Sequence, residues 1–443
     1  MSEGLDRLSA SQAAQAIASG FITSEQLVQA CLDQIREKEP QVQAWQFLDE
    51  KHALDQARAR DQERAEGRSL GALHGIPIGV KDIIDTDDMP TEDGTSLHAG
   101  RTPANDATVV ALLRAAGAVI MGKTVTTECA NMTPGKTRNP HNLERTPGGS
   151  SSGSAAAVAA NMVPLAIGTQ TSGSIIRPAS YCGVYGFKPS HGLISRQGIL
   201  KLSRSLDTVG FFSRSLEDLA LIADQLVGYD ERDLDTRPRA PMRFAELVKS
   251  EPPLPPTLAF VKTAVWGRAE ESTHQAFAEL VEELGGRCQT IELPSSLQLA
   301  WEQQRIISES EMAFNLDLEW QKGQHALSAG LRQRLESGRA TSALSYQHAL
   351  ATVPKLLKEF DEVFASFDAL ITPASTGTAP GLDSTGDPVF CSLWSLLGMP
   401  AVNLPLMTGA DQMPLGVQLV GSRLQDARLL RTANWLQNQI LQT

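Results

Sequence analysis

The sequence is poor in cysteine and in aromatic residues, and it has no long apolar run. Its five cysteines are scattered along the chain, at positions 31, 129, 182, 288 and 391, and none forms a CxxC pair. This pattern argues against a zinc motif and a disulfide framework, so we expect a reducing, cytoplasmic location. The first residues, MSEGLDRLSASQ, lack the basic start and apolar stretch of a signal peptide. No run of 18 apolar residues occurs, so no membrane partner is expected.

Basic residues are outnumbered by acidic ones. The chain has 39 Lys and Arg against 51 Asp and Glu, which gives a net charge of −12. Binding to nucleic acid needs clustered positive charge, so no nucleic-acid partner is expected. No metal-ligand spacing occurs, and no GK[ST] follows a glycine-rich loop, so we expect neither a metal nor another cofactor. With 443 residues, 42% of them hydrophobic, the chain can bury a sizeable core.

The stretch from residue 146 to 174 stands out because two Gly/Ser-rich loops bracket a run of small and apolar residues. The first loop is GGSSSGS at 148–154, and the second is TQTSGS at 169–174. Glycine lets the backbone approach a ligand closely, and serine supplies hydroxyls that act as nucleophiles or relays. The pattern predicts a prearranged polar site, although composition alone fits ordinary turns as well.

Apolar strands and amphipathic helices alternate along the rest of the chain. The expected helices are several within 5–67, then 108–117, 215–228, 271–284, much of 297–366, and 426–441. The expected strands are 76–80, 118–121, 163–167, 257–265, 288–293, 368–372, 400–405 and 416–420, with 205–212 as a crossing segment. The order strand, helix, strand at 257–293 indicates a parallel βαβ unit.

This alternation predicts an α/β protein with one large mixed β-sheet covered by helices. We expect a single domain over 1–443. Within it, 1–70 is an N-terminal helical layer, 75–228 is the core and 230–256 is a surface linker. A helical excursion at 297–366 is expected near the substrate entrance.

Three segments resemble the amidase signature family. They are the signature itself, PGGSSSGS through SGSIIRPASYCGVYGFKP to Gly198, the upstream GIPIGVKDIID at 75–85, and the closing PLGVQLVGSRLQDARLL from Pro414. These segments span most of the chain in the expected order. The resemblance implies an α/β/α sandwich with the signature at its centre, and hydrolysis of an amide without a cofactor.

The resemblance also assigns a catalytic triad: Ser174 as the nucleophile, Ser150 as the bridging serine and Lys81 as the base. It implies a cis Gly149–Ser150 peptide bond that points Ser150 between the other two groups. Without the resemblance, a lysine at the end of an apolar strand is more often a group that reaches toward solvent. A base must be neutral, whereas an exposed lysine titrates near ~10.4, so Lys81 is expected to be buried.

Other positions take supporting roles by the same resemblance. Main-chain N–H groups of Thr171, Ser172, Gly173 and Ser174 would form the oxyanion hole, and Ser152 and Thr169 would support the triad. The substrate-lining segment falls on Glu128, Cys129, Ala130 and Asn131, where the details match poorly. No family role falls on His74, His141 or His191.

Three departures from the family pattern lie in the second loop. Gln170 replaces an aspartate, Ser172 a glycine and Ile176 an arginine. Loss of an acidic and a basic residue together predicts a neutral arrangement there, with Arg177 pointing elsewhere. The nearby GSSSG also fits a GxSxG nucleophile elbow centred on Ser151, but no strand precedes it.

The main functional interpretation is an amidase that converts a small or medium non-peptide amide into a carboxylate and ammonia or an amine. A second is a glutaminyl-tRNA amidotransferase subunit, which works with partner proteins and against which the departures count. A third is a non-catalytic scaffold, which the intact triad disfavours. The expected partner is a small-molecule amide, and a homodimer is one assembly considered.

Overall fold

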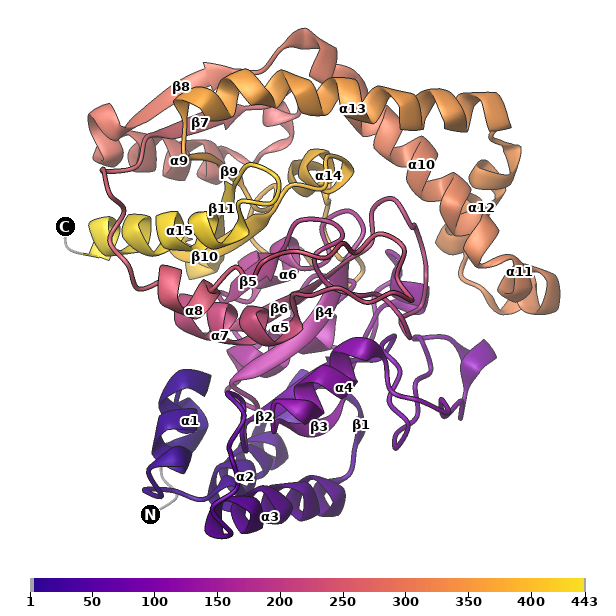
Figure 1. Cartoon of the computed structure of the whole chain (residues 1–443). Helices are drawn as coiled ribbons and strands as arrows, with labels where there is room; N and C mark the ends of the chain where they lie inside the picture. The colour runs from indigo at the N-terminus through magenta and orange to yellow at the C-terminus, as the bar shows by residue number, and fades with distance from the viewer. Residues whose placement is uncertain (1–3, 442–443) are drawn as a thin grey trace.

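A mixed sheet of eleven strands runs through the computed structural model, which describes residues 4–441 (Figure 1). The strands are β1 (Trp45–Leu48), β2 (Pro77–Lys81), β3 (Val119–Thr124), β4 (Leu165–Gln170), β5 (Tyr185–Lys188), β6 (Thr208–Ser213), β7 (Leu258–Lys262), β8 (Cys288–Glu292), β9 (Ala369–Pro373), β10 (Ala401–Thr408) and β11 (Pro414–Val420). Their order across the sheet is β1-β3-β2-β4-β6-β5-β10-β11-β9-β7-β8. The predicted fold class is confirmed.

The sheet is parallel near each end and antiparallel in its middle. β3, β2 and β4 are parallel to one another, and so are β9, β7 and β8. The strands between β4 and β9 pair antiparallel. β7 and β8 flank a helix and pair in parallel, so the predicted βαβ unit is confirmed.

Helices cover the sheet (Figure 1). They are α1 (Ala10–Ala18), α2 (Ser24–Val42), α3 (Glu50–Ala65), α4 (Thr108–Ala115), α5 (Ser152–Ala159), α6 (Ile176–Tyr181), α7 (Leu216–Leu226), α8 (Phe244–Leu247), α9 (Glu271–Leu284), α10 (Ala300–Asn315), α11 (Asp317–Gly323), α12 (Ala329–Ala340), α13 (Ala343–Ser366), α14 (Val389–Leu396) and α15 (Asp426–Leu441). None of these described helices has the length and apolar character needed to cross a membrane.

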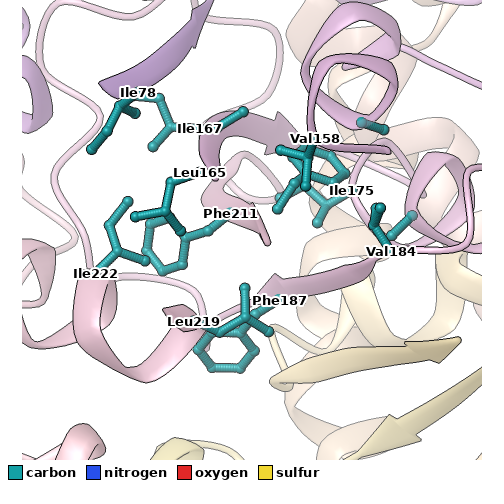
Figure 2. Close-up of a cluster of buried hydrophobic side chains, with 14 of the residues drawn as sticks. Ile78, Val158, Leu165, Ile167, Ile175, Val184, Phe187, Phe211, Leu219 and Ile222 are labelled. Carbon is teal, nitrogen blue, oxygen red and sulfur yellow. The ribbon is translucent and has the colours of Figure 1, made fainter. Parts of the chain in front are cut away.

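The core between β4, β6 and their covering helices is apolar because these strands are buried along their whole length. Figure 2 shows Leu165 and Phe211 beside Ile222 of α7, and Val158 of α5 beside Ile175. Removing this much apolar surface from water is the main favourable term in folding. It also fixes the two strand ends from which the polar loops of the signature leave.

Two sequence-based expectations need correction. Residues 1–70 are not purely helical, because β1 lies between α2 and α3 and pairs antiparallel with β3. Four residues between two longer helices carry too little periodicity to be recognised as a strand. The 230–256 segment is also not a free surface linker: it contains α8, whose Phe244 is buried, and Asp233 bonds Arg196. The wider division of the chain into functional regions stays a prediction.

Candidate active site

The polar loops of the signature converge at the carboxyl ends of β2 and β4. These strands are parallel neighbours, with Val80 opposite Ile167, so both chains leave the sheet at the same edge. Lys81 is the last residue of β2, and Thr169 lies near the end of β4. The loop before α5 carries Ser150 to the same place. Sheet pairing therefore brings together segments that are far apart in the sequence.

Lys81 is buried, and its amine contacts two hydroxyl groups. The Nζ atom lies 2.7 Å from Ser150 Oγ and 2.9 Å from Thr169 Oγ1. Burial lowers the pKa of the Lys81 ammonium well below its ordinary value, and the charge of Asp207 opposes that shift only in part. The surroundings therefore favour the neutral amine that a general base requires.

Ser150 follows a cis peptide bond from Gly149, as expected from the resemblance. Glycine is required before that bond, because a Cβ atom there would lie 2.9 Å from the side chains of both Thr127 and Thr385. The predicted contact of Ser150 with Lys81 is confirmed. The predicted contact with Ser174 is not among the hydrogen bonds of residues 4–441, in which Ser174 Oγ has no partner.

The second loop presents unused main-chain donors. Within the described chain, the N–H groups of residues 171–174 donate no hydrogen bond to another residue, whereas those of Ile175 and Ile176 both donate to Gln170 Oε1, at 2.9 and 3.0 Å. Gln170 Nε2 donates to Ser395 Oγ, which in turn donates to the carbonyl of Ser172 at 2.7 Å. The arrangement around Gln170 is neutral, as expected, and it leaves the N–H groups of residues 171–174 available.

Side chains of this loop are held from both sides. Thr171 Oγ1 donates to Asp207 at 2.6 Å, and Ser172 Oγ accepts from Gln304 Nε2 of α10 at 2.8 Å. Ser152, predicted as a supporting residue, donates to the carbonyl of Gly148 at 2.8 Å and closes the first loop on itself. Sequence reasoning missed Asp207 and Gln304, because neither lies in the motif.

Ser174 lines a small cavity of about 20 Å³. Of the segment predicted to line the substrate, Ala130 and Asn131 reach this cavity, whereas Glu128 and Cys129 are not among its walls. Glu128 instead accepts from the N–H of Ser328, and Cys129 is fully buried.

The helical excursion closes this cavity from outside the signature. Ser308 and Met312 of α10 and Arg334 of α12 form part of its wall. No motif marks these residues in the sequence, and only the packing of α10 and α12 against the loops brings them there. That the excursion controls substrate entry stays a prediction.

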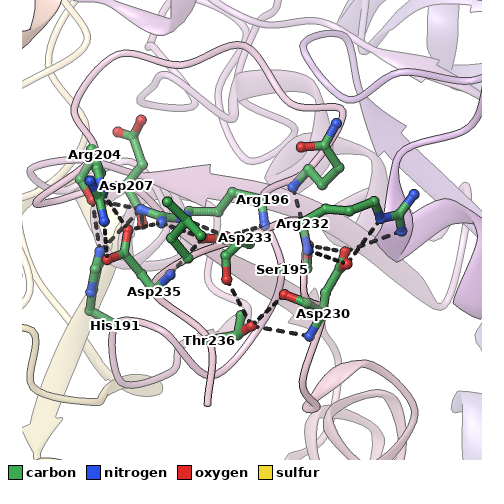
Figure 3. Close-up of polar contacts among 12 residues, drawn as sticks. His191, Ser195, Arg196, Arg204, Asp207, Asp230, Arg232, Asp233, Asp235 and Thr236 are labelled. Carbon is green, nitrogen blue, oxygen red and sulfur yellow. Dashed lines mark hydrogen bonds and ion pairs between the residues drawn. The ribbon is translucent and has the colours of Figure 1, made fainter. Parts of the chain in front are cut away.

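A larger cavity of about 410 Å³ is lined in part by Thr169 and Thr171. Neither Ser150 nor Ser174 is among its lining residues, whereas Ser174 lines the smaller cavity. The walls of the larger cavity include the polar network of Figure 3, in which Arg196 bonds Asp233 and Asp235. Most charges of this network are therefore already paired.

Within residues 4–441, one group of carboxylates has the spacing of a metal site: Asp87, Asp88 and Asp106. Arg114 already bonds two of them, Asp88 at 2.7 Å and Asp106 at 2.9 Å. The group lies on the surface, and none of its members lines the Ser174 cavity. The position of this carboxylate group therefore does not connect it with chemistry at Ser174.

The chain is similar to known proteins in both sequence and structure. The family model described as Amidase matches residues 26–430. A curated relative, the A subunit of glutamyl-tRNA(Gln) amidotransferase from Chloroflexus aggregans, is 36% identical, with 97% of this chain and 96% of that protein aligned. A similar solved structure is the native peptide amidase from Stenotrophomonas maltophilia, with 29% identity, a TM-score of 0.85, and coverage of 98% of this chain and 97% of that one. Another comes from a vestigial protein complex related to the origins of an s-triazine catabolic enzyme, with 27% identity, a TM-score of 0.91, and coverage of 97% and 98%.

Proposed function

Because this chain belongs to the amidase family, we propose that it hydrolyses the C–N bond of a small amide through Ser174, Ser150 and Lys81. The observation that carries the proposal is the 2.7 Å contact between Lys81 Nζ and Ser150 Oγ in a buried site. A lysine held in this way, without an acidic partner on its Nζ among the described residues, is suited to take up a proton rather than to form an ion pair.

The proposed reaction begins with a proton relay. Neutral Lys81 takes the proton of Ser150 while Ser150 takes that of Ser174, and Ser174 Oγ attacks the carbonyl carbon of the amide. The C–N bond of the tetrahedral intermediate then breaks, and the relay returns a proton to the leaving nitrogen. Water attacks the resulting ester in the same way and releases the carboxylate.

The oxyanion of each intermediate would be bound by the free N–H groups of residues 171–174. Preorganised donors of this kind contribute strongly, and loss of one typically costs about 2.7–4 kcal/mol of transition-state stabilisation. Gln170 and Ser395 support this role because they satisfy the neighbouring groups and hold the loop in place.

A second candidate function is that of an amidotransferase component, which would release ammonia from glutamine for a partner protein. The departures at Gln170, Ser172 and Ile176 count against it. The relatives favour it more strongly, since curated proteins of 32–36% identity over most of this chain carry that name. Both candidates use the same triad and differ in the substrate and in the need for partners. A scaffold role is disfavoured by the buried Lys81–Ser150 contact.

The experiment is an ammonia-release assay on the purified chain, with glutamine and a panel of aliphatic, aromatic and urea-type amides, using Ser174→Ala as the control. Hydrolysis of a panel amide by the chain alone supports the amidase. Release of ammonia from glutamine only after the chain copurifies with partner proteins supports the second candidate. Complete inactivity, together with failure of a fluorophosphonate to label Ser174, would eliminate both.

A further inference from the structure

A buried guanidinium lies beside the nucleophile. Arg177 is only 1% exposed and lines the same cavity as Ser174. Its Nη2 donates to the carbonyl of Gly149 at 2.7 Å, whereas Nε and Nη1 are buried and have no partner among the described residues. As expected, Arg177 makes no hydrogen bond with Gln170 among the described residues. Its guanidinium instead turns toward Gly149, in the loop that carries Ser150.

A buried arginine with two unused donors is an uncommon arrangement, because buried charges are normally paired. Nothing in the described chain pairs it: none of the ion pairs involves Arg177, and all residues that line the cavity lack a carboxylate. Its planar group carries N–H donors in a fork that matches the two oxygens of a carboxylate.

A second arginine in the wall of this cavity is already paired. Arg334 also lines it, where it donates to Asn131 Oδ1 at 2.9 Å and lies 3.6 Å from Glu309. Glu309 balances Arg334 from outside the cavity and also pairs with Arg305. Arg177, in contrast, makes no ion pair among the described residues and keeps two unused donors.

We propose that Arg177 binds a carboxylate of the substrate, so that the substrate is a small amide that also carries a carboxylate group. This inference rests on the proposed function of Ser174. The Arg177 N–H bonds the carbonyl of Gly173, and its guanidinium bonds that of Gly149, so both loops hold it close to the reacting serines. Arg177 and Ser174 line the same cavity, so only a short chain can separate the carboxylate from the amide.

The test compares two amides of equal length, succinamate and butanamide, which differ in having a carboxylate or a methyl group at the far end. The wild type should show kcat/KM roughly 10- to 100-fold higher for succinamate, the range expected for a hydrogen bond to a charged group. In Arg177→Gln this ratio should fall toward one, mainly through a higher KM for succinamate, and Arg177→Lys should retain part of it. Arg332→Gln removes a charge from the same helix as Arg334 but outside the cavity, and should leave the ratio unchanged.

Two outcomes would overturn the inference without touching the proposed function. One is a wild type that hydrolyses butanamide as well as succinamate. The other is an Arg177→Gln enzyme that loses the same factor in kcat on both substrates, since this would mean that Arg177 acts on the oxyanion or the loop.

A binding measurement decides the case even if no amide is hydrolysed. Succinate should bind to the Ser174→Ala protein in calorimetry and fail to bind when Arg177→Gln is added, with unchanged thermal melting as the check of folding. If the double variant does not fold, Arg334→Gln in the Ser174→Ala background should weaken succinate binding. Equal binding by the variants, or no binding by Ser174→Ala, refutes a carboxylate site. Inactivity on all amides together with succinate binding would refute the proposed function alone.

Discussion

Lys81 Nζ and Ser150 Oγ lie 2.7 Å apart although 69 positions separate them in the chain. The contact forms because Lys81 ends β2 and Ser150 lies in the loop before α5, a helix that packs against both β2 and its parallel neighbour β4. Burial of both side chains keeps water from competing for the hydroxyl. In the proposed mechanism this pair is the base and proton relay, and its properties can be tested separately from those of Ser174.

Replacement of Lys81 by alanine should lower kcat by about 10²–10⁴-fold, the usual contribution of a positioned general base. Because burial lowers the pKa of Lys81, the wild-type rate should rise with pH as the ammonium loses its proton and then level off. Steady-state rates across pH would show this acidic limb, which should be absent in Lys81→Ala. Lys201→Ala, which removes an exposed lysine, is the matched control. An unchanged pH profile in Lys81→Ala would remove Lys81 from the mechanism.

Ser174→Ala should abolish hydrolysis and covalent labelling by a fluorophosphonate while the fold is kept, since it removes one hydroxyl that has no protein partner among the described residues. A small residual rate from the oxyanion hole is expected, as in other serine hydrolases. Ser151→Ala is the informative control, because Ser151 is the centre of the alternative GSSSG elbow. Ser151 Oγ donates to the carbonyl of Thr169 and lies ahead of α5, so its role here is structural. Labelling that survived in Ser174→Ala and vanished in Ser151→Ala would reverse the assignment.

The resemblance to the family assigned Ser150 and Ser174 within the signature and Lys81 in the upstream segment, and the structure brings Lys81 and Ser150 into contact. The buried strands were predicted because a run such as LAIG is apolar on both faces. Arg334, Gln304 and Ser395 could not be predicted, since they reach the site only through packing of segments more than 130 positions away. Arg177 lies within the motif, yet only the structure shows that its guanidinium turns toward Gly149.

Gln170→Met should lower both stability and activity. Methionine fills a similar volume but leaves the N–H groups of Ile175 and Ile176 buried without an acceptor, at a cost of about 1–3 kcal/mol for each. The loop with the oxyanion donors would then lose its support, so kcat should fall more than KM changes. Ser395→Ala removes only the hydrogen bonds that Ser395 Oγ makes with Gln170 Nε2 and with the carbonyl of Ser172. It should therefore have a smaller effect on stability and on kcat. Thermal melting and steady-state kinetics of the two variants provide the measurement. Equal effects would contradict the view that the bonds from Ile175 and Ile176 to Gln170 hold the loop in place.

The last prediction concerns His98, which joins the N-terminal half of the chain to α11. Its ring contacts Asp93 at 2.8 Å and Glu319 at 3.1 Å, and these carboxylates raise the pKa of His98 to about 9. Arg101, 3.8 Å from Asp93, is the positive group that faces this cluster.

A raised pKa in the folded state means that the stabilisation is fully present below the pKa of the unfolded chain, near ~6.5, and is lost as pH rises through about 9. The partial exposure of the His98 side chain weakens the effect by solvent screening. Melting temperature should therefore fall between pH 7 and 10 more in the wild type than in His98→Gln, by roughly 1 °C for each kcal/mol lost in a chain of this size. His325→Gln, at an exposed histidine, should follow the wild type. If His98→Gln showed the same decline as the wild type, the charged bridge between Asp93 and Glu319 would not contribute to stability.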